Sequence, residues 1–220
     1  MIGTLDRRST LRRTALTYLA MAAALLLASG AALLVGSGKE ADAASRFKIV
    51  TRTFSNPTAI QIPNSGAANP YPSAINVGNL RRGRVLDVNV TMKNYFHGFT
   101  QDVDVELVGP RGQQATVMSD VGNFQDPNNA IVTLDDEAQA PLSPFAGILT
   151  GRFKPTNENG GDSDAFPLPA PGATATSRLS VFDSTNPNGT WNLFVFDDTG
   201  GEAGQMAGGW SLQIKAKVRR

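Results

Sequence analysis

The sequence predicts an all-β protein with a jelly-roll-like β-sandwich, preceded by an N-terminal signal or anchor helix. Three observations support the sandwich. Apolar and polar side chains alternate with a period of two after residue 43, helical periodicity is almost absent there, and clusters of Gly, Pro and Asn separate the alternating stretches. Many short strands with turn signals between them are typical of sandwiches and jelly rolls.

The first predicted strands lie in residues 47–118. Residues 47–54 form one strand and residues 85–92 a second, which has an apolar and a polar face. Residues 102–107 repeat this pattern with acidic side chains on the polar face, and a turn at 109–112 leads into a strand at 115–118, which predicts a hairpin. In the second strand the apolar face comprises Leu86, Val88, Val90 and Met92, and the polar face Asp87, Asn89, Thr91 and Lys93.

The remaining strands follow the same pattern, and two Pro/Gly/Asn-rich stretches separate the elements. The second stretch is long for a structureless loop in a compact domain, so we expect it to contain short strands such as 148–153. The predicted strands are 131–134, 179–182, 191–196 and 210–218, and the two stretches are 55–79 and 138–177.

Residues 1–43 are typical of an export signal. Arginines precede an apolar run from Ala15 to Val35, and Ala41-Asp42-Ala43 fits a signal-peptidase site with cleavage after Ala43. The alternative is a retained anchor, because the run is long enough to cross a bilayer, which takes roughly 20 residues. In either case, the arginines before the apolar run are expected to keep the N-terminus on the cytoplasmic side of the membrane. The body is therefore expected to be secreted or extracytoplasmic, or membrane-anchored with the body outside.

The composition excludes several classes of function. The chain of 220 residues has 20 Lys+Arg and 19 Asp+Glu, a net charge of +1 that gives no basis for nucleic-acid binding. The absence of Cys excludes thiol catalysis, disulfides and Cys-based metal sites. His97 is the single histidine, so it is the one candidate for the base of a Ser/His/Asp triad, with Asp102 or Asp104 and a serine such as Ser119.

Several segments carry a family resemblance. They are residues 85–90, the His97-to-Val103 strand entry, the Val108-to-Gly112 turn, the Gly189-to-Asp198 block and the Gly208-to-Leu212 strand start. In these segments the chain resembles the P domain (P/Homo B domain) of kexin- and furin-type proprotein convertases, in a secreted bacterial branch, over about residues 58–216.

The resemblance implies a jelly-roll sandwich of the galactose-binding-like kind and a non-catalytic role. In convertases the P domain packs on the subtilisin-like protease domain, stabilises it and tunes its response to calcium and pH. This chain has no room for such a protease domain and no nucleophile motif, so we expect no enzyme activity, although a serine endopeptidase label could pass to it by family association. The resemblance implies structural roles for His97, Trp191, Trp210, Gly189 and Gly209.

Acidic side chains gather at the predicted turns. Carboxylates beside Asn and backbone carbonyls are the ligands that Ca²⁺ prefers, so calcium is the one candidate cofactor, against the simpler hypothesis that each Asp caps a turn. The first-choice ligands are Asp102, Asp104, Asp120 and Asp136. Trp191 and Trp210 also leave open a carbohydrate-stacking platform, although their alternation with apolar residues favours the core.

These observations predict three segments and one leading function. The segments are a signal peptide or retained anchor at 1–43, an N-terminal strand and Pro/Asn-rich lead-in at 44–80, and the sandwich at 81–218. The function is a non-catalytic module that stabilises or binds a partner outside the membrane. The alternatives are an accessory of a subtilisin-like serine endopeptidase encoded elsewhere and a cell-surface adhesion or carbohydrate-binding module. The expected partners are such a protease or a cell-surface component, with no nucleic acid and with membrane contact only through the N-terminal segment.

Overall fold

The computed structural model describes residues 46–124, 127–158, 164–172, 174 and 176–220. Residues Phe47–Arg220 form one structural unit. The predicted signal or anchor segment, residues 1–43, lies outside the described residues. In the described part of the chain, no helix is long and apolar enough to cross a membrane.

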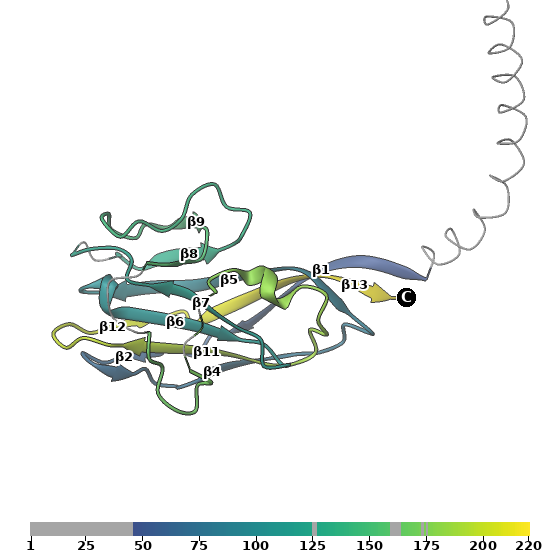
Figure 1. Ribbon diagram of the computed structural model, residues 1–220, viewed down its shortest axis with the longest axis horizontal. Coiled ribbons are helices and arrows are strands. Elements are labelled where there is room, and N and C mark those ends of the chain that lie inside the picture. The colour runs from purple at the N-terminus through teal and green to yellow at the C-terminus, as the bar shows by residue number, and fades with distance from the viewer. Residues whose placement is uncertain (1–45, 125–126, 159–163, 173, 175) are drawn as a thin grey trace, which may run out of the picture. The chain divides into compact units, whose positions relative to one another are not determined.

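Two mixed sheets share one apolar core, and this arrangement confirms the predicted all-β sandwich (Figure 1). Jelly-roll connectivity stays a prediction. Sheet A has the strand order β1-β13-β5-β12-β2, with β8 on the opposite edge of β5 and β9 beside β8. Its strands are β1 Phe47–Asn56, β2 Ile60–Ile62, β5 Arg84–His97, β8 Ala130–Leu134, β9 Gly151–Phe153, β12 Gly204–Met206 and β13 Trp210–Arg219.

Sheet B has the order β10-β7-β6-β11-β3, and β4 also pairs with β11. Its strands are β3 Gly66–Ala67, β4 Ser73–Val77, β6 Val103–Val108, β7 Gln114–Ser119, β10 Thr156–Asn157 and β11 Gly189–Asp197. β6 and β7 form the predicted antiparallel hairpin. The predicted strands at 47–54, 85–92, 131–134, 191–196 and 210–218 are also present, within a few residues of their expected ends.

The first and last described strands pair along their whole length. β1 runs antiparallel to β13 from Phe47 opposite Arg219 to Asn56 opposite Trp210. The apolar residues of β13 are buried and alternate with exposed Gln213, Lys215 and Lys217, as the period of two predicts. β1 therefore belongs to the sandwich itself. The sandwich starts at Phe47 rather than at residue 81, because β1 to β4 supply strands to both sheets.

One residue of β5 lies on a different face from the one predicted. The register between β5 and β13 shifts between Lys215 and Ala216, so Val85 pairs with Ala216 while Asp87 pairs with Lys215. This bulge breaks the strict alternation at Leu86, which is 41% exposed, whereas Val85 is fully buried. Val88, Val90 and Met92 do face the core, as predicted.

The polar face of β6, which carries its acidic side chains, is buried and not exposed to solvent. All six residues of β6 are buried, including Asp104 and Glu106. The reason is a cover segment, residues 164–172, that packs over the outer face of sheet B. Phe166 and Ala170 of the cover segment form a small apolar cluster with Val108 and Phe194.

Polar contacts also hold the cover segment in place. The Tyr71 hydroxyl donates to the Pro167 carbonyl at 3.0 Å, and Gln114 Nε2 donates to the Gly172 carbonyl at 3.0 Å. Tyr71 and Gln114 come from opposite sides of sheet B, one before β4 and the other on β7. The cover segment is thereby attached on both sides of the apolar cluster.

The predicted strand at 179–182 is wrong, because Leu179–Phe182 forms a 3₁₀ helix. The side chain of Asp136 accepts hydrogen bonds from the backbone N–H groups of Leu179 (3.0 Å) and Ser180 (2.9 Å), which satisfies the first donors of the helix. Leu179 and Phe182 are buried on one side. A run of four residues is too short for its periodicity to distinguish the two structures.

Candidate functional site

The four predicted calcium ligands do not come together. Asp104, at the start of β6, and Asp120, after β7, both lie near Ser119, whose Oγ is 3.3 Å from Asp120 Oδ2 and 2.8 Å from Asp164 Oδ1. The pKa of Asp104 is raised to about 8, mainly by burial and also by the nearby carboxylates Asp164, Asp198 and Asp120, while a hydrogen bond from Ser119 opposes the shift.

Asp102 belongs to a second group of charges. The pKa of Asp102 is raised to about 6, mainly by burial and also by the charges of Asp197 and Glu202, while His97 opposes the shift. Asp136 lies away from both groups, because its two oxygens cap the 3₁₀ helix at Leu179 and Ser180. Asp136 therefore accepts backbone hydrogen bonds, as the simpler hypothesis of a capping role predicts. Sequence proximity to turns did not reveal this difference.

His97 is fully buried, and both of its ring nitrogens are engaged. Nε2 lies 3.1 Å from Asp197 Oδ2, and Nδ1 lies 2.8 Å from the Phe99 carbonyl oxygen. Asp197 is also fully buried and accepts a backbone hydrogen bond from Thr199 at 3.2 Å. The partner of His97 is therefore Asp197, rather than Asp102 or Asp104 as the triad hypothesis supposed.

Ser119 is not placed as a nucleophile of this histidine. Its Oγ contacts the carboxylates of Asp164 and Asp120, and a nucleophilic serine needs a base within hydrogen-bond reach. The described residues thus contain a buried His–Asp pair and a separate Ser–carboxylate group, which lack the mutual geometry of a triad. A substrate also has no access to a base that is 0% exposed.

Both tryptophans lie in the core and form no stacking platform. Trp191 and Trp210 are 0% exposed, and their indole N–H groups donate to the Pro187 carbonyl (2.9 Å) and to Ser73 Oγ (3.0 Å). Gly209 directly precedes β13 and has a φ of +63°, and Gly189 is the first residue of β11 and has a φ of +132°. A side chain at Gly189 would place Cβ 2.6 Å from Pro110 Cβ, so this position requires glycine on two grounds.

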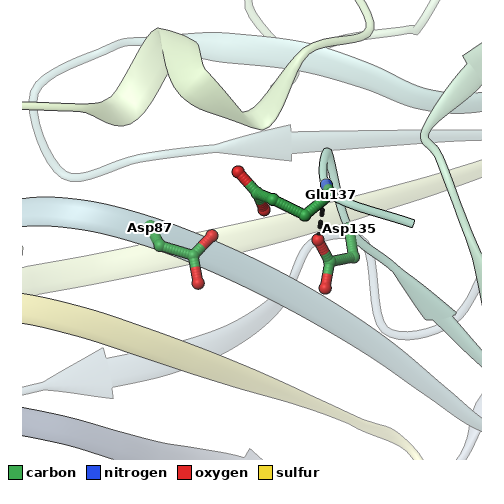
Figure 2. A group of neighbouring side chains, drawn as sticks. All are labelled: Asp87, Asp135 and Glu137. Carbon is green, nitrogen blue, oxygen red and sulfur yellow. Dashed lines mark hydrogen bonds between the residues drawn. The ribbon is translucent and has the colours of Figure 1, made fainter. Parts of the chain in front are cut away.

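A different acidic group is the strongest candidate for a cation site among the described residues. Asp87 of β5 and Asp135 and Glu137 after β8 each offer a carboxylate oxygen, and these oxygens all lie within 4.8 Å of one another (Figure 2). We call these residues the acidic trio. Burial raises the pKa of Asp87, and the Glu137 carboxylate raises it further, while Lys215 and Arg152 oppose the shift.

The buried member of the trio, Asp135, already has several partners. Its Oδ1 accepts the backbone N–H of Glu137 at 2.7 Å, the bond drawn in Figure 2, and its Oδ2 pairs with the guanidinium of Arg152. In the orientation that satisfies both atoms of its amide, Asn89 also donates from Nδ2 to Asp135 Oδ2 at 2.9 Å. Asp135 therefore orients both Arg152 and Asn89.

The trio matches a hard cation in donor type but supplies too few ligands. Ca²⁺ takes about 6–8 oxygens, whereas the trio offers three carboxylates, one of which is shared with a guanidinium. Water would have to complete the shell, which limits the trio to weak binding. The residues Asp135-Asp136-Glu137 stand out in the sequence, but only the pairing of β5 with β8 shows that Asp87 joins them.

Beside the trio, a groove crosses the outer face of sheet A. Its volume is about 440 Å³, within the usual range for ligand pockets. The lining consists mainly of hydroxyl and amide side chains that lie on or next to β1, β5, β8, β9 and β13. The alternation in the sequence places several of these side chains on the polar face of their strands but does not show that they form a groove. The lining residues are Thr53, Asn89, Thr91, Ile131, Thr133, Thr150, Gly151, Arg152, Ser211 and Gln213.

Comparison with known proteins finds little similarity. No protein-family model matches the chain, and no curated protein sequence matches it. Two solved structures contain a similar arrangement at low scores. One is the complex of the Aeromonas sobria serine protease with the chaperone ORF2, with 12% identity and a TM-score of 0.37 over 79% of this chain. The other is the serine protease of Aeromonas sobria, with 14% identity and a TM-score of 0.34 over 76% of this chain.

This chain spans 27% of the length of each of those matched chains. At these scores the similarity carries no conclusion about the fold or the function of this protein.

Proposed function

We propose that this chain is an exported, non-catalytic P-domain-like module that stabilises or binds a partner outside the membrane. Three features of the chain support this proposal: the arginine-led apolar segment at 1–43, the motifs around His97 and Trp191, and the two-sheet sandwich. In this proposal the His97 motif is structural and joins the two sheets.

The state of His97 is the observation that carries the non-catalytic part. The single histidine of the chain is 0% exposed and bridges Asp197 of β11 and the Phe99 carbonyl. Because β5 belongs to sheet A and β11 to sheet B, this contact ties the two sheets together at one end. A general base must reach the proton that it removes, and a buried histidine with both nitrogens engaged does not.

Two measurements test this proposal. Expression of the full sequence in a bacterial host should place the chain outside the cytoplasm, with a mature N-terminus at Ala44 or with Met1 retained in the membrane fraction. The exported chain should show no hydrolysis of fluorogenic peptides. Turnover that a serine-protease inhibitor blocks, or an intact chain confined to the cytoplasm, would contradict the proposal.

The accessory role in proteolysis is the second candidate, and its support is the motif resemblance. A P-domain-like module would raise the thermal stability of a subtilisin-like protease that lacks such a domain. Its test is the residual activity of a protease from a neighbouring gene after heating, with and without the exported chain. The matched control is the same chain after heat denaturation.

A further inference from the structure

The polar groove on sheet A is built from two rows of side chains that cross the strands. In the first row Thr53 of β1 lies opposite Gln213 of β13, which lies opposite Asn89 of β5. In the second row Ser211 of β13 lies opposite Thr91 of β5, which lies opposite Thr133 of β8. Neighbouring strands are about 4.8 Å apart, so each row repeats a polar group at that spacing across the sheet.

The floor of this groove is more enclosed than a solvated sheet face requires. Asn89 and Ser211 belong to the outer face of the sheet, yet each is only 6% exposed. β8 lies beside β5 and β9 beside β8 (Figure 1). Ile131 of β8, Arg152 of β9 and Thr150, which precedes β9, contribute to the lining. The Oγ1 atoms of Thr91 and Thr133 are 3.0 Å apart, so these hydroxyls are held by each other. The polar groups are thus preorganised in a hollow.

The chemistry of the lining determines the class of ligand. Hydroxyl and amide groups both donate and accept hydrogen bonds, which suits a ligand that does the same along its length. Among the described residues that line the groove, Arg152 is the one that carries a charge, and Asp135 neutralises it. A charged ligand would therefore gain little. The methyl groups of the threonines and the half-exposed Ile131 offer the apolar contacts that a sugar ring also needs.

From these observations we propose that the groove binds an uncharged polysaccharide that lies across the strands of sheet A. A peptide is the poorer fit, because an added peptide strand pairs along an edge strand and not across a face. Both ends of the groove reach edge strands, β1 on one side and β9 on the other, so a long chain can extend past the protein. This inference names the ligand of the non-catalytic module and rests on that proposed function.

Affinity electrophoresis of the exported chain tests the proposal. Native gels contain hydroxyethyl cellulose, xylan or soluble starch as neutral probes and carboxymethyl cellulose as an anionic probe. We expect retardation by at least one neutral probe. Gln213→Ala should weaken this binding about tenfold, since a lost amide contact typically costs about 1–1.5 kcal/mol. Thr53→Arg, which places a long charged side chain at one end of the first row, should abolish it.

Gln61→Ala is the matched control. Gln61 lies on the same outer face of sheet A but on β2, where it pairs with Gln205 and does not line the groove. This variant should keep the wild-type retardation, and all three variants should melt within a few degrees of the wild type. The inference is overturned if no neutral probe retards the chain, or if the anionic probe alone does so. It is also overturned if both groove variants keep the wild-type retardation, because the groove would then be an ordinary solvated sheet face. Peptide hydrolysis would instead contradict the proposed function, so the two failures are distinct.

Discussion

Glu106 is the buried group whose replacement has the clearest consequence. It lies on the outer face of β6, between Thr116 and Phe194 of the neighbouring strands, and it is 0% exposed. Among the described residues, neither of its side-chain oxygens has a hydrogen-bond partner. Burial raises the pKa of Glu106 from 4.5 to about 7. The folded protein therefore holds a proton on Glu106 that the unfolded chain releases.

The size and sign of the effect follow from this difference. Between pH 4.5 and pH 7 the folded state binds more protons than the unfolded state, so stability falls as the pH rises through this window. The contribution is fully present below pH 4.5 and is lost above pH 7. A pKa difference of about 2.5 corresponds to about 3 kcal/mol in the free energy of unfolding. Glu106→Gln does not titrate, so this loss should disappear.

The assay is urea unfolding at a series of pH values from 4 to 8.5. The free energy of unfolding of Glu106→Gln, minus that of the wild type, should rise by about 3 kcal/mol across the series. Asp102 and Asp104 titrate in both proteins, so the subtraction removes their contribution. Glu158→Gln, an exposed control, should give a flat difference. The reasoning is refuted if the Glu106→Gln difference is also flat.

Three further predictions concern the cation site, the histidine and a glycine. If the acidic trio binds Ca²⁺ weakly, a Ca²⁺ concentration ten times the dissociation constant should stabilise the chain by about 1.4 kcal/mol relative to the chain in EGTA. Glu137→Gln should remove the resulting shift in melting temperature, whereas Asp120→Asn should keep it. His97→Ala should lower the free energy of unfolding in urea by about 3–5 kcal/mol, because it leaves buried Asp197 without its partner. The double variant with Asp197→Asn should lose less stability than the sum of the two single variants. Gly189→Ala should lower the free energy of unfolding by at least about 2 kcal/mol, because φ at this position is +132° and the new Cβ would meet Pro110. Gly78→Ala is the control in the same assay and should be nearly neutral, because the space around Gly78 is open.

The long strands could be predicted because their periodicity directly reflects burial. In β13 the alternation of Leu212, Ile214 and Ala216 with exposed residues matches the two faces of the strand. Local pattern fails where a distant segment changes the environment. Asp104 and Glu106 look like a wet face in the sequence, but the cover segment, far along the chain, buries them. Short runs such as Leu179–Phe182 fail because four residues do not establish a period.

The candidate sites were the hardest part to predict, because they depend on strand register. Asp87 meets Asp135 only because β5 pairs with β8 in one register, and Gln213 meets Asn89 only through the pairing of β13 with β5. A shift of one residue would place these side chains on the opposite face. Residue type alone therefore identified acidic turns, but it grouped Asp136 with Asp102, Asp104 and Asp120, from which the structure separates it.

The pairing of β1 with β13 also determines when the chain can fold. β13 lies between β1 and β5, so the edge strand β1 is not joined to the rest of sheet A until residues 210–219 have been synthesised. Contacts between segments so far apart in sequence make folding slow. During synthesis, β1 therefore waits for a pairing partner that is more than 150 residues away in the sequence. The strand order thus makes the completion of sheet A a late step, because it depends on residues 210–219.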